Sequence, residues 1–263
     1  MATPPILDHK HHAADSAFTP EALLREARRQ KGIATQDVPS ICALDPDGDL
    51  VRHLVRRGEA LTDESWACYH TSLYRTVVGG RTVGIVGCAV GAPFAVLVAE
   101  QLFAAGCRLL ISITSSGQLV ALRDPPYFVL IEKALRDEGT SYHYLPAGEF
   151  SVADASLLSR LQDAFEGLRV PIERGATWTT DAPFRETTKA IAAMRAKGLL
   201  AVEMEAAALY AFSLARGKRV VCFAHVTNQM GRVEDDFEKG EDDGTVDALC
   251  VIERTVCALA EKA

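Results

Sequence analysis

Short apolar runs alternate with longer helical patterns along most of the chain. The apolar runs predict buried strands at residues 38–44, 72–78, 81–88, 109–114, 170–180 and 218–226. The helical patterns predict helices at residues 20–32, 94–106, 129–137, 154–167, from 183 onward and at 245–263. Strand, helix and strand in succession with short connections favour parallel pairing, and therefore a layered α/β fold. Ligands of such folds gather at the carboxyl ends of the strands.

The stretch LLAVEMEAAAL, residues 199–209, combines an apolar run with two acidic residues. It predicts a strand that ends in a turn, with an alanine-rich helix starting at or just after Glu205. A helix N-terminus favours a carboxylate, but Glu203 and Glu205 are costly to bury in so apolar a setting without partners. A cis-diol is a suitable partner, because one carboxylate can accept hydrogen bonds from two adjacent hydroxyls. The alternative is that both acids are solvated residues at the start of the helix.

The composition fits one large core. The chain has 263 residues, of which 48% are hydrophobic, and no linker-like break, so we expect a single domain over 1–263. A net charge of −7 argues against nucleic acid or an anionic membrane as the main partner. No uncharged apolar run is long enough to span a membrane. Residues 1–17 lack the hydrophobic region of a signal peptide and are expected to form a loosely ordered tail.

The cysteines and the acidic residues near the C-terminus indicate no metal site. The seven cysteines are widely spaced, without a CxxC pair, which is typical of buried thiols in a cytoplasmic protein rather than of a disulfide framework or a zinc site. Residues 231–244 hold seven acids and predict a mobile, solvated loop. That loop lacks the ligand spacing of a calcium site, so we expect no metal.

Two loops carry groups suited to an anion. The turn-rich sequence DPDGDLVRHL, residues 45–54, presents backbone N–H groups and Arg52 ahead of a helix. The run at 109–114 ends in small residues, Ser115 and Gly117 among them, that leave room and offer N–H and O–H donors. Each pattern also has a structural interpretation, as a surface turn in the first case and as an ordinary strand end in the second.

Three further side chains stand at predicted strand ends. Trp178 and Phe184 flank the end of the run at 170–180, where each packs in the core or lines a pocket. Asn228 follows the run at 218–226 and can donate and accept hydrogen bonds, or simply cap the next loop.

The sequence VEMEAAALY, residues 202–210, resembles the signature of the nucleoside phosphorylase family, which includes purine nucleoside phosphorylases, uridine phosphorylases and related nucleosidases. The resemblance implies a three-layer phosphorylase/hydrolase-like fold with a central mixed sheet flanked by helices. It implies that Met204 and Glu205 hold the ribose, with Glu205 accepting from the 2′- and 3′-hydroxyls. Gly48 and Arg52 match the family's phosphate loop, although leucine replaces its proline, and Ser115 matches its phosphate-gripping serine or threonine.

The resemblance also places the base. An aromatic residue of the family packs against the base, and Phe184 matches it better than Pro183. Asn228 matches a position that faces the base, commonly an aspartate, and asparagine there occurs in some relatives specific for 6-oxopurines. Asp181 matches an aspartate that we interpret as structural. Purine or pyrimidine preference stays open, with Asn228 favouring a 6-oxopurine.

The implied activity is that of a pentosyltransferase: phosphorolysis of a ribonucleoside to free base and ribose 1-phosphate. Glu205 and Asn228 would be catalytic, phosphate would be the co-substrate, and no metal or organic cofactor is required. The family forms homo-oligomers, so we expect a dimer or hexamer with a shared active site.

The sequence departs from the family's pattern at two positions. Ser112 stands where many phosphorylases have an arginine, and no arginine occurs near Tyr69 and His70, where a neighbouring subunit's phosphate arginine would fall. These departures keep two alternatives open, a nucleoside hydrolase on the same fold and a catalytically weakened nucleoside-binding protein.

Overall fold

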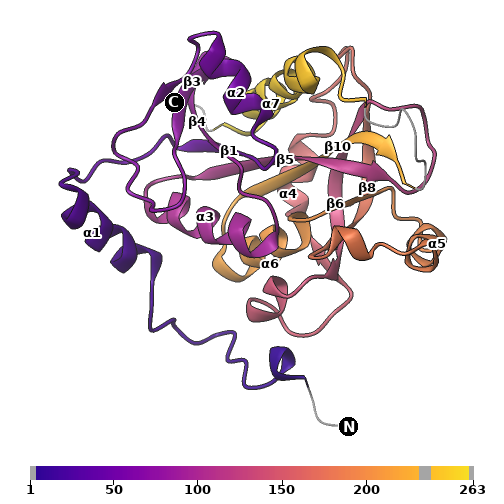
Figure 1. Ribbon diagram of the computed structural model, residues 1–263, viewed down its shortest axis with the longest axis horizontal. Coiled ribbons are helices and arrows are strands. Elements are labelled where there is room, and N and C mark those ends of the chain that lie inside the picture. Colours follow the sequence, from indigo (N-terminus) through magenta and orange to yellow (C-terminus); the bar gives the residue numbers. More distant parts are fainter. Residues whose placement is uncertain (1–3, 231–237, 261–263) are drawn as a thin grey trace.

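The computed structural model describes residues 4–230 and 238–260. Within them a ten-stranded mixed sheet lies between two groups of helices (Figure 1). Helices α1 (Pro20–Lys31), α3 (Ala92–Ala104) and α6 (Ala206–Arg216) pack on one face. Helices α2 (Asp49–Arg56), α4 (Ala155–Arg160) and α7 (Thr245–Leu259) pack on the other. The predicted fold, a central mixed sheet flanked by helices, is confirmed.

The remaining elements are strands and short helices. The strands are β1 (Ile41–Asp45), β2 (Leu61–Thr62), β3 (Tyr74–Val78), β4 (Arg81–Gly87), β5 (Leu109–Gln118), β6 (Tyr127–Asp137), β7 (Phe150–Val152), β8 (Ile172–Thr180), β9 (Ala201–Glu203) and β10 (Val220–Gln229). The other helices are α5 (Thr188–Ala196) and the 3-10 helices η1 (Pro5–Leu7), η2 (Thr140–His143), η3 (Pro183–Arg185) and η4 (Glu241–Gly244).

Strand β5 joins two halves of the sheet. On one side the order β5-β1-β4-β3-β2 forms an open sheet, with β5, β1 and β4 parallel. On the other side the pairings β5–β10, β10–β6, β6–β8, β8–β9 and β9–β5 close a ring. Both β9 and β10 meet β5 at one point, because Val202 and Asn228 each pair with Gly117. The ring, which the sequence pattern did not predict, thus brings three strand ends together.

Several predicted elements are confirmed in detail. Thr19 caps α1, its side chain accepting from the Ala22 N–H at 3.2 Å, and Gly32 ends that helix in the left-handed conformation. The central stretch forms β9, a turn, and α6 starting after Glu205. Residues 206–213 of α6 are buried, and their alanines let the helix lie close to the sheet.

The predicted helix at 129–137 is wrong, because these residues belong to strand β6. The segment VLIEKALRD is rich in helix-favouring residues, yet β6 pairs with β8 on one side and with β10 and β7 on the other. Tertiary pairing therefore overrides local propensity. The helix predicted at 154–167 shortens to α4, which the Asp154 side chain caps, and the helix predicted from 183 divides into η3 and α5.

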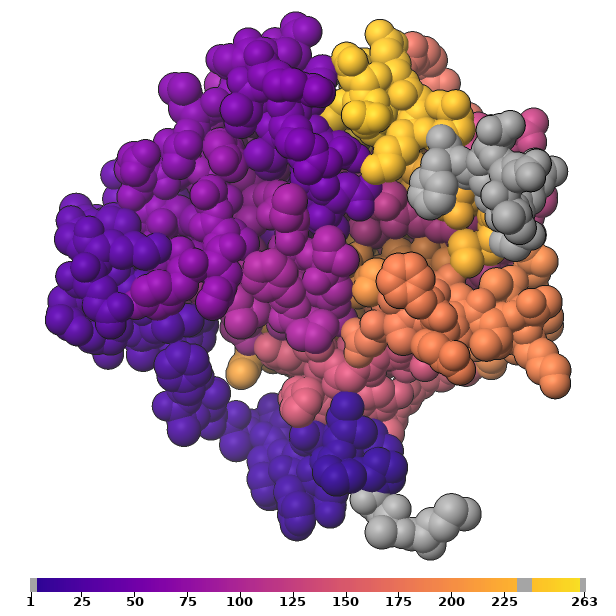
Figure 2. Space-filling view, viewed as in Figure 1, coloured from indigo at the N-terminus to yellow at the C-terminus, as the bar shows by residue number. Residues whose placement is uncertain are grey.

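The N-terminal residues form an arm that leaves the body of the protein (Figures 1 and 2). The arm is largely exposed but touches the body near η2, where His12 Nε2 lies 3.1 Å from the Tyr142 carbonyl oxygen. Residues 231–237 of the predicted acidic loop lie outside the described residues. The described part of the chain contains no helix with both the length and the apolarity to cross a bilayer.

All seven cysteines lie among the described residues, and all are free thiols. Cys42, Cys68, Cys107 and Cys222 are buried, as predicted. The prediction is wrong for the rest, because two are exposed and one is half-buried: Cys88, Cys257 and Cys250.

Candidate active site

The two acids of the central stretch have different surroundings. Glu203 ends β9 and is surrounded by donors: the Thr177 hydroxyl at 3.1 Å, the Thr179 hydroxyl, and the N–H groups of Glu205 and Ala206, each at 2.7 Å. Glu203 therefore stabilises the start of α6 by accepting hydrogen bonds from its first N–H groups. With its lone pairs occupied by the protein, Glu203 has little capacity left for a ligand.

Glu205 has fewer partners and is just as deeply buried, at 1% exposure, so the solvated alternative is wrong. Its Oε1 accepts from the Gly91 N–H at 2.7 Å, the Thr114 hydroxyl contacts the carboxylate, and the Met204 N–H lies 3.3 Å from Oε2. Burial, reinforced by the nearby Glu203 charge, raises the pKa of Glu205 to about 8. A buried carboxyl with unused acceptor capacity is a candidate for binding hydroxyl groups.

The turn between β1 and α2 forms the loop that the sequence assigns to phosphate. Gly48 adopts φ +77°, and a Cβ there would lie 2.8 Å from Arg52 Nη1, so the guanidinium folds back over the glycine. Asp45 accepts from the N–H groups of Gly48 and Val51 at 3.1 and 3.0 Å. Those two N–H groups are therefore not free to bind an anion, and the group that the loop can offer to one is the Arg52 guanidinium. Burial raises the pKa of Asp45 to about 7, and the charges of Asp47 and Asp49 add to that effect.

Ser115 lies beside this loop. Its Oγ donates to Asp47 Oδ1 at 3.0 Å, so the structure brings Ser115 and the residues around Gly48 and Arg52 together. Lys239 joins them from the chain ahead of α7, with Nζ 3.2 Å from Asp47 Oδ2 and 2.6 Å from Asp49 Oδ2. Partial burial opposes its charge, but the two aspartates raise the pKa of Lys239. Sequence analysis did not single out Lys239, whose only signal is a cation within an acidic segment.

Asn228 is half-buried near the end of β10, beside Gly117. Its Nδ2 lies 3.8 Å from Met230 Sδ. A Cβ on Gly117 would lie 2.2 Å from Met230 Sδ, so glycine lets Met230 cover this strand end. Met204, in the turn before α6, is also half-buried. Asn228 and Met204 thus reach the same crossing of β5, β9 and β10.

The predicted base aromatic lies outside this cluster. Phe184, in η3, is 99% exposed, so no residue described in the structure covers its ring. Trp178 lies in the core, which confirms the first of the two interpretations of this residue. Its Nε1 donates to Asp137 at 2.9 Å. Asp181 accepts from the Gly139 N–H at 2.8 Å, a contact consistent with a structural role.

The positions that lack the family's arginines can now be placed. Ser112 is 1% exposed, and its hydroxyl has no hydrogen-bond partner among the described residues. It lies on the α3–α6 side of the sheet, away from Ser115. Tyr69 and His70 are exposed, and Tyr69 donates to Gln30.

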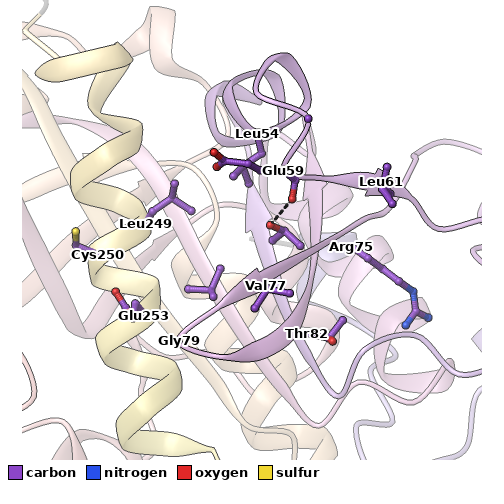
Figure 3. Close-up of a pocket in the computed structure, with 13 residues that line it drawn as sticks. Leu54, Glu59, Leu61, Arg75, Val77, Gly79, Thr82, Leu249, Cys250 and Glu253 are labelled. Atoms are coloured by element: carbon purple, nitrogen blue, oxygen red, sulfur yellow. Dashed lines mark hydrogen bonds between the residues drawn. The ribbon is translucent and has the colours of Figure 1, made fainter.

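A separate groove of about 700 Å³ lies between the β3–β4 hairpin and α7 (Figure 3). Leu249 and Glu253 of α7 lie on one side, and Val77 and Gly79 of the hairpin on the other. None of the predicted site residues lines it. We therefore place the candidate active site at the ends of β1, β5, β9 and β10, on or next to which all the predicted site residues except Phe184 lie.

The described residues contain no group of three metal-ligating side chains arranged around one point. Besides Lys239, sequence analysis missed Gly91, whose N–H fixes Glu205. A Gly-Ala-Pro sequence at a helix start was the only signal for it. The roles assigned to Gly48, Arg52, Ser115, Met204, Glu205, Asn228 and Phe184 stay predictions.

Comparison with known proteins agrees with this fold. The phosphorylase superfamily model matches residues 40–259. A uridine phosphorylase of Thermococcus kodakarensis is 26% identical over 238 residues, which cover 81% of this chain and 84% of the relative. A DeoD-type purine nucleoside phosphorylase of Colwellia psychrerythraea is 29% identical over 162 residues, covering 60% and 68%.

A crystal structure of purine nucleoside phosphorylase from Toxoplasma gondii, in complex with immucillin-H, superposes with a TM-score of 0.71. It is 19% identical, with 84% of this chain and 91% of that chain covered, so the likeness supports the fold. Since the family model matches most of the sequence, the chain belongs to the phosphorylase superfamily.

Proposed function

We propose that this chain is a nucleoside phosphorylase, which cleaves the N-glycosidic bond of a ribonucleoside with inorganic phosphate to give free base and ribose 1-phosphate. The relatives named above, a uridine phosphorylase and a purine nucleoside phosphorylase, support this reaction class. The observation that carries the proposal is the buried carboxyl of Glu205, which contacts Thr114, the residue before Ser115 on β5.

Glu205 accepts hydrogen bonds from the 2′- and 3′-hydroxyls of the ribose. Those bonds favour the ionised carboxylate, so ribose binding lowers the pKa of Glu205 from about 8. Positive charge develops on the ribose as the glycosidic bond breaks, and the carboxylate stabilises it in a site of low dielectric. Met204 packs beside the sugar. The flexible side chains of Met204 and Met230 can move aside for it at low cost.

Asn228 stabilises the base as it leaves with negative charge, by donating a hydrogen bond from its amide. Phe184 packs against the base, which gives its exposed ring a function. Phosphate is held by Arg52 and Ser115, and Gly48 leaves room for the Arg52 guanidinium beside the turn. A nucleophile held in line gains from proximity, which contributes on the order of several kcal/mol. Phosphate is the co-substrate, and the reaction requires no metal or organic cofactor.

We further propose a homo-oligomer, a dimer or hexamer, in which a second copy completes the site. Large apolar side chains are exposed on the surface: Val90, next to Gly91, is 50% exposed, Tyr69 is 43% exposed and Phe184 is 99% exposed. A monomer in light scattering would contradict this. We also propose a cytoplasmic location, because free exposed thiols such as Cys88 and Cys257 are typical of a reducing compartment.

The decisive assay measures base release from a panel of purine and pyrimidine nucleosides with and without phosphate. The proposal predicts release only with phosphate, together with ribose 1-phosphate in the ³¹P NMR spectrum. Equal release in phosphate-free buffer would instead show a nucleoside hydrolase. Thermal stabilisation by nucleosides without base release in either buffer would show a binding protein.

A further inference from the structure

The phosphate end of the site holds a second cation that belongs to this chain. Lys239 Nζ bridges Asp47 and Asp49, at 3.2 and 2.6 Å, and Asp49 also pairs with Arg52. Lys239 and Arg52 therefore stand on opposite sides of one carboxylate. The Lys239 side chain is 27% exposed and that of Asp49 is 15% exposed, so the pair is partly withdrawn from water.

Asp47 occupies the position between the donors suited to an anion. One of its carboxylate oxygens accepts from Ser115 Oγ at 3.0 Å, and the other from Lys239 Nζ at 3.2 Å. The backbone carbonyl of Asp47 also accepts a hydrogen bond from Arg52 Nη2, at 3.0 Å. A hydroxyl and one cation, Lys239, thus converge on the Asp47 carboxylate, and Arg52 contacts the backbone of the same turn, which is largely buried.

His225 supplies an independent sign that a hydrogen-bond partner is missing at this place. It pairs with Ser115 across β10 and β5, stacks on Phe128 with ring centroids 4.3 Å apart, and is 6% exposed. Its Nε2 is buried without a hydrogen-bond partner among the described residues. Burial lowers the pKa of His225 to about 4, and among the charged groups around it Asp47 opposes that shift most. Buried polar atoms without partners are uncommon, and a bound ligand is one explanation for them.

We propose that Lys239 is a phosphate-binding residue of this chain, and that Asp47 holds its ammonium and the Ser115 hydroxyl in place until phosphate displaces the Asp47 carboxylate. The inference rests on the proposed phosphorylase activity and extends it. Ser112 and the residues near Tyr69 provide no arginine, and Lys239 supplies the missing charge from within the chain. A phosphate dianion can form charge-assisted hydrogen bonds with the same ammonium and hydroxyl groups as the carboxylate it replaces.

The test compares two neighbouring substitutions with opposite expected effects on the KM for phosphate. Lys239→Ala removes one charge-assisted contact and raises that KM by about 10- to 100-fold, whereas Lys239→Arg keeps the cation and stays within severalfold of wild type. Asp47→Asn removes the competing anion and lowers the KM for phosphate severalfold. The KM for the nucleoside is unchanged in all three variants. A structural role for the cluster would raise the phosphate KM of both Lys239→Ala and Asp47→Asn.

Lys218→Ala is the matched control, because Lys218 precedes the start of β10, at the opposite end from Asn228, and lies 5.6 Å from the Phe103 ring centroid. It should leave both KM values unchanged. An unchanged phosphate KM in Lys239→Ala, or a raised one in Asp47→Asn, would overturn the inference while leaving the proposed function intact. If wild-type protein released base without phosphate, the proposed function itself would fail. Phosphate binding to each variant, measured by calorimetry, gives a readout independent of turnover.

Discussion

Substituting Glu205 by glutamine should make the protein more stable and nearly inactive. Glutamine has the same shape, can still accept from the Gly91 N–H, and carries no charge. The pKa of Glu205 is raised from 4.5 to about 8. Because the folded protein favours the protonated form, the wild-type carboxyl lowers the free energy of unfolding progressively as pH rises from about 4.5 to about 8.

The size of the stability effect follows from that shift in pKa. At about 1.4 kcal/mol per pH unit, the cost of Glu205 reaches roughly 3 kcal/mol at neutral pH, and Glu205→Gln removes it. The activity of Glu205→Gln should fall, because a neutral amide cannot accept strongly from two hydroxyls. Two charge-assisted hydrogen bonds at about 1.5–3 kcal/mol each predict a fall in kcat/KM of about 10²- to 10⁴-fold.

Urea unfolding at acidic, neutral and alkaline pH, beside kcat/KM for phosphorolysis, measures both effects. The difference in stability between Glu205→Gln and wild type should grow with pH. Glu203→Gln is the matched control, because that acid accepts from donors at the start of α6 and its substitution should leave kcat/KM within about tenfold of wild type. Near-normal activity of Glu205→Gln, or equal stability of the two proteins at alkaline pH, would refute the reasoning.

Three further substitutions test the rest of the site. Gly48→Ala forces a side chain into a left-handed position beside Arg52, so it should cost about 1–2 kcal/mol in urea unfolding and raise the KM for phosphate. Gly117→Ala would collide with Met230 and should cost about 1–3 kcal/mol and activity, which Met230→Ala should partly restore in the double variant. Phe184→Ala should leave stability within about 0.5 kcal/mol, because the ring is exposed, but raise the nucleoside KM severalfold. An unchanged nucleoside KM would remove Phe184 from the base site.

The sequence predicted most of the fold because its strongest signals are local. The cap at Thr19 and the change from apolar strand to alanine-rich helix after Glu205 each depend on neighbouring residues. Strand β6 was mispredicted because only its partners β8 and β10, far away in sequence, select an extended conformation. The closed ring of strands has the same origin.

The candidate site was predictable only in part for the same reason. The sequence predicts site residues that belong to one motif, such as Met204 and Glu205. It does not predict contacts between segments that are distant in the sequence. Gly91 reaches Glu205 across 114 positions, and Lys239 reaches Asp49 across 190. Burial alone separates the roles of Glu203 and Glu205 poorly, since both are buried. Their hydrogen-bond partners separate them clearly.

The central claim is that Glu205 holds the two ribose hydroxyls during phosphorolysis. The most direct measurement compares kcat/KM for a ribonucleoside with its 2′-deoxy and 3′-deoxy analogues, in wild type and in Glu205→Gln. We predict that wild type discriminates strongly against both analogues and that the variant loses most of this discrimination. Equal discrimination in the two proteins would show that another group binds the hydroxyls, and would contradict the account.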